Sequence, residues 1–120
     1  MSLFESGEDY LERILVLKER NGQVRSIDIA TDMGFSKPSI SIAMKKLKEG
    51  GFISIDENGL ISLTEEGHAI ATRIYERHQV LTAWFISLGV PEDIAMKDAC
   101  KIEHDLSDES FNAIKQTLKK

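Results

Sequence analysis

Residues 26–63 read SIDIATDMGFSKPSISIAMKKLKEGGFISIDENGLISL, and this stretch decides the fold. Apolar residues recur at helical spacing in residues 26–34 and 36–49, and each segment opens with a serine that can act as an N-cap. Two short segments of alternating polarity, 52–55 and 60–63, follow on either side of Asp-Glu-Asn-Gly, a sequence typical of hairpin turns. The stretch therefore predicts two helices joined by a tight turn and followed by a β-hairpin, which is a winged helix-turn-helix.

Helical patterns flank this stretch on both sides. Residues 5–20 carry apolar side chains at helical spacing and end at Asn21-Gly22. Three more helical segments follow the hairpin, at residues 65–88, 91–105 and 108–118, the first and last preceded by the N-cap residues Thr64 and Ser107. We therefore expect a mainly α protein, with a winged helix-turn-helix domain at residues 1–66 and an all-helical domain at residues 67–120.

The composition limits the class of protein. The chain has 120 residues, of which 42% are hydrophobic and 29% are charged, as in a globular domain rather than a disordered chain. No apolar run approaches the roughly 20 residues of a membrane helix, and the start MSLFESGEDYLER lacks the features of a signal peptide. A single cysteine, Cys100, suits a reducing compartment. We expect a cytoplasmic protein without a membrane partner.

The second helix of the helix-turn-helix is locally basic, although the whole chain has a net charge of −5. Four of the eight Lys and Arg residues that precede Gly67 lie in this helix. Such a helix enters the major groove of DNA, and small hydroxyl side chains near its start allow close approach to phosphates. The residues that we expect to contact DNA are Ser36, Lys37, Ser39, Ser41, Lys45 and Lys46. An ordinary solvated lysine face remains the alternative interpretation of these residues.

The expected wing does not share this basic character. Its turn holds Asp56 and Glu57, whose carboxylates would repel phosphate. Either the wing stays away from the DNA backbone, or its acids turn outward, and the sequence leaves both arrangements open.

The second half of the chain carries residue types that bind divalent transition metals. Cys100, Glu103 and His104 are spaced i, i+3, i+4, which predicts that they share one helix face within a turn. Asp9 and Glu12 share a face of the first helix, and His78 lies in the long helix after the hairpin. Each of these residues alone also fits an ordinary surface or core role. Because three separate helices offer ligands, a metal that joins them is the stronger hypothesis.

Several motifs together resemble one protein family. They are Glu8-Asp9-Tyr10-Leu11-Glu12, Ser26-Ile27-Asp28-Ile29-Ala30, Leu63-Thr64-Glu65-Glu66-Gly67, Arg77-His78, and the stretch from Ala99 to Ser107 that reads ACKIEHDLS. Over almost its whole length the chain resembles the diphtheria toxin repressor and manganese transport regulator family of metal-dependent bacterial repressors. From this resemblance we expect the short form of the family, without the optional SH3-like domain, as in the manganese branch.

The resemblance implies a homodimer that binds near-palindromic operator DNA when a divalent metal is bound. It places six residues on the family's ligand positions: Asp9, Glu12, His78, Cys100, Glu103 and His104. Asp9 and Glu12 are of the manganese type, whereas a cysteine at position 100 is of the iron type. The implied cofactor is Mn²⁺ or Fe²⁺, with Co²⁺, Ni²⁺ or Zn²⁺ able to bind in vitro, and either one or two ions per subunit.

Two other classes of function remain open at this point. A winged-helix regulator without metal could sense a small organic ligand between its helices. An enzyme could use the carboxylates and His104 for metal-assisted hydrolysis, but the sequence has no nucleophile elbow, phosphate-binding glycine loop or zinc-protease motif. We therefore expect a regulator and not an enzyme. Cys100 could act as a redox sensor instead of a ligand.

Overall fold

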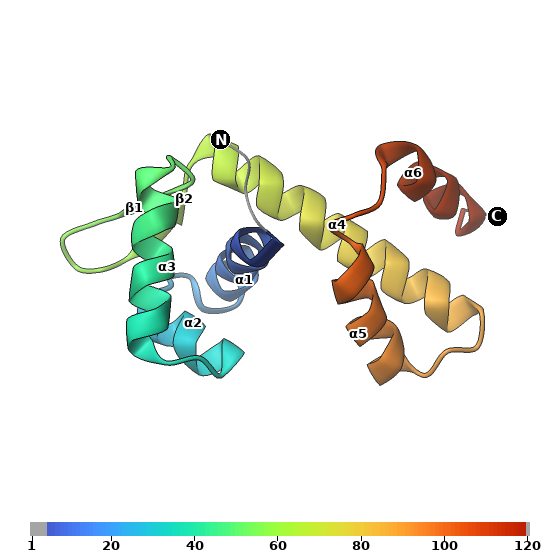
Figure 1. Cartoon of the computed structure of the whole chain (residues 1–120), viewed down its shortest axis with the longest axis horizontal. Helices are drawn as coiled ribbons and strands as arrows, with labels where there is room; N and C mark the ends of the chain where they lie inside the picture. Colours follow the sequence, from blue (N-terminus) through green and yellow to red (C-terminus); the bar gives the residue numbers. More distant parts are fainter. Residues whose placement is uncertain (1–4, 120) are drawn as a thin grey trace. The chain divides into compact units, whose positions relative to one another are not determined.

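The computed structural model describes residues 5–119 and divides into two compact units, one up to Thr72 and one from Arg73 onward. The elements, labelled in Figure 1, are α1 (Glu5–Asn21), α2 (Ser26–Met33), α3 (Lys37–Glu49), β1 (Ile53–Ile55), β2 (Ile61–Leu63), α4 (Glu65–Ser87), α5 (Glu92–Ile102) and α6 (Asp108–Thr117). This order confirms the expected winged helix-turn-helix followed by helices. None of the helices within residues 5–119 is both long and apolar enough to cross a membrane.

The turn between α2 and α3 follows from two local signals. Gly34 ends α2 with a φ of +72°, a left-handed conformation that glycine adopts without steric cost. Ser36 caps α3, as expected, because its Oγ accepts the backbone N–H of Ser39. The expected cap at Ser26 is wrong: Arg25 is the N-cap of α2, and its backbone N–H donates to the Asp28 carboxylate at 2.9 Å. Ser26 instead begins the helix.

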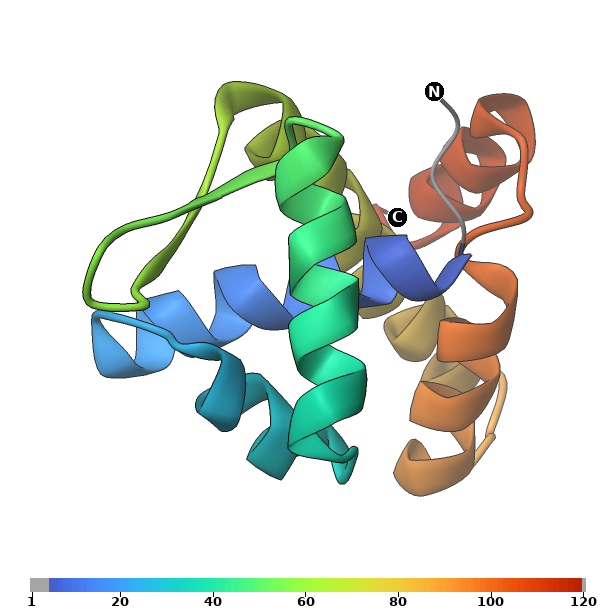
Figure 2. The same ribbon diagram turned by 60° about the vertical axis from the view of Figure 1, so that its left-hand side comes forward.

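The wing is an antiparallel hairpin anchored to the segment before α2. Ile53 pairs with Leu63 and Ile55 with Ile61, and the hairpin extends to one side of α3 in Figure 2. The Ile61 N–H also donates to the Val24 carbonyl at 2.8 Å. Because this bond ties β2 to the start of the helix-turn-helix, the wing and α2 belong to one folded unit.

A close contact joins the wing to the beginning of α4. Thr64 caps α4 by accepting the Gly67 N–H, and its hydroxyl donates to the Gly51 carbonyl at 2.8 Å. A Cβ at Gly67 would clash with the Phe52 carbonyl oxygen, so only glycine fits at this position. Beneath these contacts lies a core of fully buried apolar side chains from the helices and the hairpin, including Leu11, Ile14, Ile29, Ile40, Met44 and Ile61.

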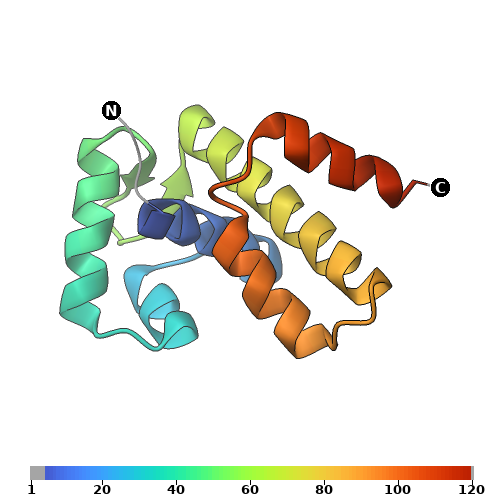
Figure 3. The same cartoon turned by 45° about the vertical axis from the view of Figure 1, so that its right-hand side comes forward.

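The second unit contains the rest of α4 together with α5 and α6. Figure 3 shows α5 and α6 on either side of this part of α4. Ser107 caps α6, as expected, by accepting the Ser110 N–H. The expectation that the α5 helix reaches residue 105 is wrong, because α5 ends at Ile102. Glu103 is its C-cap and His104 lies in the turn that follows, so a single helix face does not hold Cys100, Glu103 and His104.

Candidate metal ligands and DNA-binding helix

All six residues expected to contact DNA are exposed, on α3 or at its N-cap: Ser36, Lys37, Ser39, Ser41, Lys45 and Lys46. Ser36 has a structural role as well, since its hydroxyl donates to the Ser39 hydroxyl at 2.8 Å. Within residues 5–119, no ion pair neutralises Lys37, Lys45 or Lys46. The buried face of α3 is apolar, so the helix presents a positively charged face to solvent.

Ile42 is a residue of α3 that the sequence reasoning missed. Its side chain is 59% exposed, while Ile40, Met44 and Leu47 of the same helix are buried. Its position outside the apolar stripe of the helix is the sequence feature that indicates an exposed side chain. An exposed β-branched residue among serines and lysines adds an apolar group to an otherwise polar face.

One of the two acids of the wing, Asp56, has an internal role. Asp56 Oδ1 accepts the backbone N–H groups of Asn58 and Leu60, both at 2.9 Å, and so shapes the turn. Gly59 has a φ of +80°, as the turn sequence predicts. The Arg25 Nε donates to the Asn58 carbonyl at 3.1 Å, which brings a positive charge to the wing turn. One oxygen of the Asp56 carboxylate therefore accepts hydrogen bonds from the backbone of the wing turn.

Glu103 is the centre of the candidate metal ligands in the second unit. Its side chain is fully buried, and its Oε2 lies 3.0 Å from His78 Nδ1. Its Oε1 lies 3.5 Å from His104 Nε2 and, within residues 5–119, takes part in no hydrogen bond. A buried carboxylate oxygen without a hydrogen bond is costly unless it binds a cation. Glu103 and the two imidazoles are thus a suitable set of ligands for a divalent metal.

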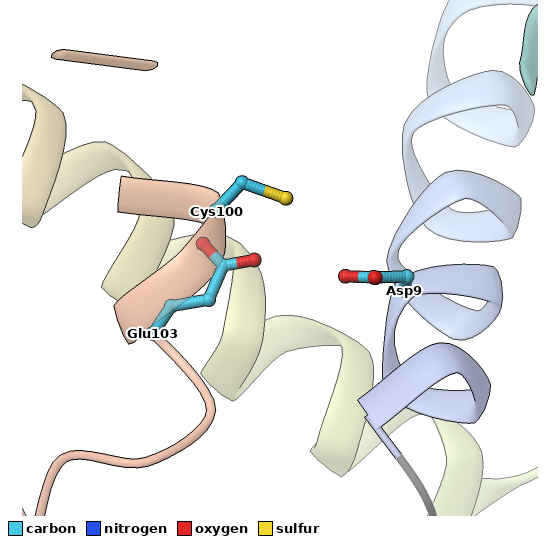
Figure 4. Close-up of side chains that lie close together, drawn as sticks. All are labelled: Asp9, Cys100 and Glu103. Atoms are coloured by element: carbon cyan, nitrogen blue, oxygen red, sulfur yellow. The ribbon is translucent and has the colours of Figure 1, made fainter. Parts of the chain in front are cut away.

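Cys100 lies on the last turn of α5, close in sequence to Glu103. Figure 4 shows both side chains projecting from this end of α5. Cys100 is exposed, in contrast to Glu103. An accessible thiol next to a buried carboxylate can act as a soft ligand beside a hard one.

Asp9 and Glu12 are the candidate ligands of the first unit, and both lie on α1. Asp9, also labelled in Figure 4, is half-buried, and Glu12 is only 6% exposed. Their i, i+3 spacing places them on one face of this helix. A carboxylate as buried as that of Glu12 is rare in proteins unless it is paired or binds a metal.

Arg77 is a second residue that the sequence reasoning missed. It is only 2% exposed, and its guanidinium donates to the carbonyls of Glu103 and Leu106, at 3.1 and 2.6 Å. It also pairs with the Asp108 carboxylate at 2.6 Å and lies over the Phe111 ring. The sequence feature that could have identified Arg77 is its position directly before His78, a predicted metal ligand. Arg77 ties α4 to the turn that carries Glu103 and His104.

The two halves of the chain match the two domains of one family. Residues 2–61 match the family's domain described as iron dependent repressor, N-terminal DNA binding domain. Residues 64–120 match its iron dependent repressor, metal binding and dimerisation domain. The chain belongs to the iron-dependent repressor family.

Individual relatives agree with this assignment. The chain is 34% identical over 118 residues to an uncharacterised helix-turn-helix transcriptional regulator of Methanocaldococcus jannaschii, covering 97% of this chain and 94% of that protein. It is 34% identical over 108 residues to the transcriptional regulator MntR of Escherichia coli, and the match covers 90% of this chain and 70% of that protein. A solved manganese-dependent transcriptional repressor in complex with manganese superposes with a TM-score of 0.84 at 28% identity. That alignment covers 94% of this chain and 52% of the solved one, so the chain spans about half the length of this structure.

Membership confirms the expected class of function. The family consists of metal-dependent transcriptional repressors, and the relatives are transcriptional regulators and not enzymes. The matches give no support to a metal-independent sensor of an organic ligand. Both manganese and iron occur in the descriptions of the family and its members.

Proposed function

We propose that this chain is a metal-activated repressor that binds near-palindromic operator DNA as a homodimer in the cytoplasm. In this proposal residues 1–66 bind DNA, and residues 67–120 form the dimer and supply most of the metal ligands. The observation that carries it is Glu103, a buried carboxylate beside two imidazoles in the domain that matches the family's metal-binding domain. The proposed metal is Mn²⁺ or Fe²⁺.

Ligands from both units would hold the metal. Asp9 and Glu12 would contribute carboxylates from α1, and the second unit would contribute the other four ligands: His78, Cys100, Glu103 and His104. Carboxylate and imidazole groups suit Mn²⁺ and Fe²⁺, while the Cys100 thiolate adds affinity for Fe²⁺, Co²⁺, Ni²⁺ and Zn²⁺. The burial of Glu12 and Glu103 supports these roles, because a divalent cation offsets the cost of burying a carboxylate.

This division of ligands supplies a physical basis for regulation. Without a cation, the carboxylates of Asp9, Glu12 and Glu103 repel one another, which disfavours any arrangement that brings α1 and the α5–α6 turn together. A bound divalent cation converts this repulsion into attraction. The metal thereby stabilises one arrangement of the two units. Because DNA binds this arrangement in our proposal, metal binding raises the affinity of the protein for DNA.

The exposed lysines of α3 would provide the phosphate contacts. The α3 helices of a dimer would enter two major grooves about one turn of DNA apart, roughly 34 Å, so the operator should be a near-palindrome. Ile42 would add an apolar contact to the C5-methyl group of thymine, the chief apolar feature of the major groove. This contact would give base specificity where the lysines give mainly affinity.

The second unit also exposes apolar side chains that suit a dimer interface. Ile86, Leu88, Ile94 and Met96 are each between 45% and 64% exposed. From the sequence we expect five apolar residues of the last three helices to form the interface: Trp84, Phe85, Ile102, Phe111 and Ile114. Phe111 does not fit this expectation, because it is only 5% exposed and lies under the Arg77 guanidinium. The interface would instead use the end of α4 and the first turns of α5.

The test is a DNA-binding measurement with controlled metal. The purified chain is titrated into fluorescent duplexes from the promoter region of its own gene, first with EDTA and then with Mn²⁺, Fe²⁺, Co²⁺ or Zn²⁺. We expect fluorescence anisotropy to rise at nanomolar protein only in the presence of metal. Binding of equal strength in EDTA would overturn the proposal.

A further inference from the structure

A buried arginine holds the backbone of the residue whose side chain is the central candidate ligand. Arg77 Nη1 donates to the carbonyls of Glu103 and Leu106, and Nη2 donates to the Asp108 carboxylate. These contacts join α4 to both ends of the turn between α5 and α6. At 2% exposure the guanidinium is largely shielded from water, which strengthens its bonds to the two carbonyls relative to bonds at the surface. The Asp108 carboxylate is 77% exposed, so the ion pair gains less from this burial.

The neighbouring residue holds the same glutamate by its side chain. His78 Nδ1 lies 3.0 Å from Glu103 Oε2, so consecutive residues of α4 contact the backbone and the carboxylate of Glu103. The contact to the backbone matters because Glu103 is the C-cap of α5. Carbonyl groups at a helix C-terminus have no partner within the helix, and Arg77 supplies the partner that the Glu103 carbonyl would otherwise lack.

We propose that Arg77 is a positioning residue that sets Glu103 and His104 in place for metal binding. This inference rests on the proposed function, since it assumes that Glu103 is a metal ligand. The guanidinium is suited to the task because its planar donors reach two carbonyls and a carboxylate at once. With the turn held before metal arrives, less conformational entropy is lost on binding.

The inference predicts how substitutions at Arg77 affect affinity. Arg77→Met keeps the aliphatic stem and removes the three polar contacts, and we expect the Kd for Mn²⁺ to rise about 10- to 100-fold, as for other residues that orient ligands. Arg77→Lys keeps the charge and can reach one carbonyl, so its Kd should fall between those of the native protein and Arg77→Met. Leu81→Ala is the matched control, because it creates a cavity in the buried part of α4 without removing a hydrogen bond to the turn.

The measurement is Mn²⁺ affinity by competition with a fluorescent chelator, on the 120-residue protein shown to be folded by circular dichroism. Amide hydrogen exchange of residues 103–107 in EDTA gives a second readout. We expect Arg77→Met to weaken metal binding and to speed exchange in this turn, whereas Leu81→Ala lowers the melting temperature but leaves the Kd within twofold. If Arg77→Met does not fold, the same comparison is made with Arg77→Lys.

The results separate this inference from the proposed function. A folded Arg77 variant with unchanged Kd and unchanged exchange would overturn the positioning role while leaving the metal site intact. If native protein fails to bind Mn²⁺, Fe²⁺, Co²⁺ or Zn²⁺, the proposed function is wrong. In that case faster exchange of the turn in Arg77→Met than in native protein would still show that Arg77 orders it, but not for metal.

Discussion

His78 and Glu103 are 25 positions apart in the sequence, and their side chains meet at 3.0 Å between Nδ1 and Oε2. The contact joins α4 to the end of α5 inside the second unit. It sets a buried carboxylate against an imidazole, two groups that bind divalent metals.

Glu103→Gln tests the central ligand. The substitution keeps the size of the side chain and removes its negative charge, so we expect the Kd for Mn²⁺ to rise at least about tenfold, roughly 1.4 kcal/mol. Isothermal titration calorimetry measures this change. Glu109→Gln removes an equally charged but exposed residue of α6 and should leave the Kd unchanged. Equal affinities of the two variants would exclude Glu103 as a ligand.

Cys100→Glu tests the choice of metal. Replacing a soft thiolate with a hard carboxylate should raise the affinity for Mn²⁺ relative to Co²⁺ and Zn²⁺ by about tenfold or more. The ratio of Kd values from chelator competition reports the preference. Cys100→Ser serves as a control that loses the thiolate without adding a carboxylate. Our interpretation of Cys100 as a ligand fails if the ratio is the same in all three proteins.

Lys46→Ala tests the phosphate contacts of α3. Removing one lysine that contacts phosphate should weaken binding to all DNA sequences and lower the slope of log K against log salt by about 0.9. Anisotropy titrations at several salt concentrations give this slope with metal present. Lys18→Ala changes an exposed lysine of α1, outside α3. If the salt slope changes only in Lys18→Ala, the phosphate contacts lie on α1 and not on α3.

Ile42→Ala tests the apolar contact to DNA. Replacing a contacted thymine by uracil removes one methyl group, and we expect this change to weaken binding of the native protein by about tenfold, ~1–2 kcal/mol. The Ile42→Ala variant should no longer distinguish thymine from uracil at that position. Anisotropy with paired duplexes measures the discrimination, and Ile27→Ala, at an exposed isoleucine of α2, is the control. Undiminished discrimination in Ile42→Ala would argue that another group contacts the methyl.

Gly67→Ala tests the close approach between α4 and the wing. Alanine favours a helix over glycine by about 1 kcal/mol, but here its Cβ would clash with the Phe52 carbonyl oxygen. We expect the clash to dominate and the free energy of unfolding to fall by about 1–3 kcal/mol. Chemical denaturation of the apo protein measures it. An increase in stability would show that the Phe52 carbonyl moves away from α4 at little cost.

Local signals in the sequence determined the order of the elements and most of their ends. The hairpin turn, the glycine at the end of α2 and the caps at Ser36, Thr64 and Ser107 all lie where the sequence places them. Such signals act over three or four residues, because a cap or a left-handed glycine satisfies only the nearest backbone groups. The sequence also pointed to the residue types of the metal ligands and to the family.

Packing between distant segments decided the rest. The α5 helix ends at Ile102, and the Glu103 carbonyl that follows is bound by Arg77, 26 positions earlier in the chain. The same guanidinium covers Phe111, which the helical pattern alone could not distinguish from an interface residue. Only the tertiary structure brings His78 to Glu103, because a hydrogen bond between two helices depends on how they pack and leaves no local pattern in either one.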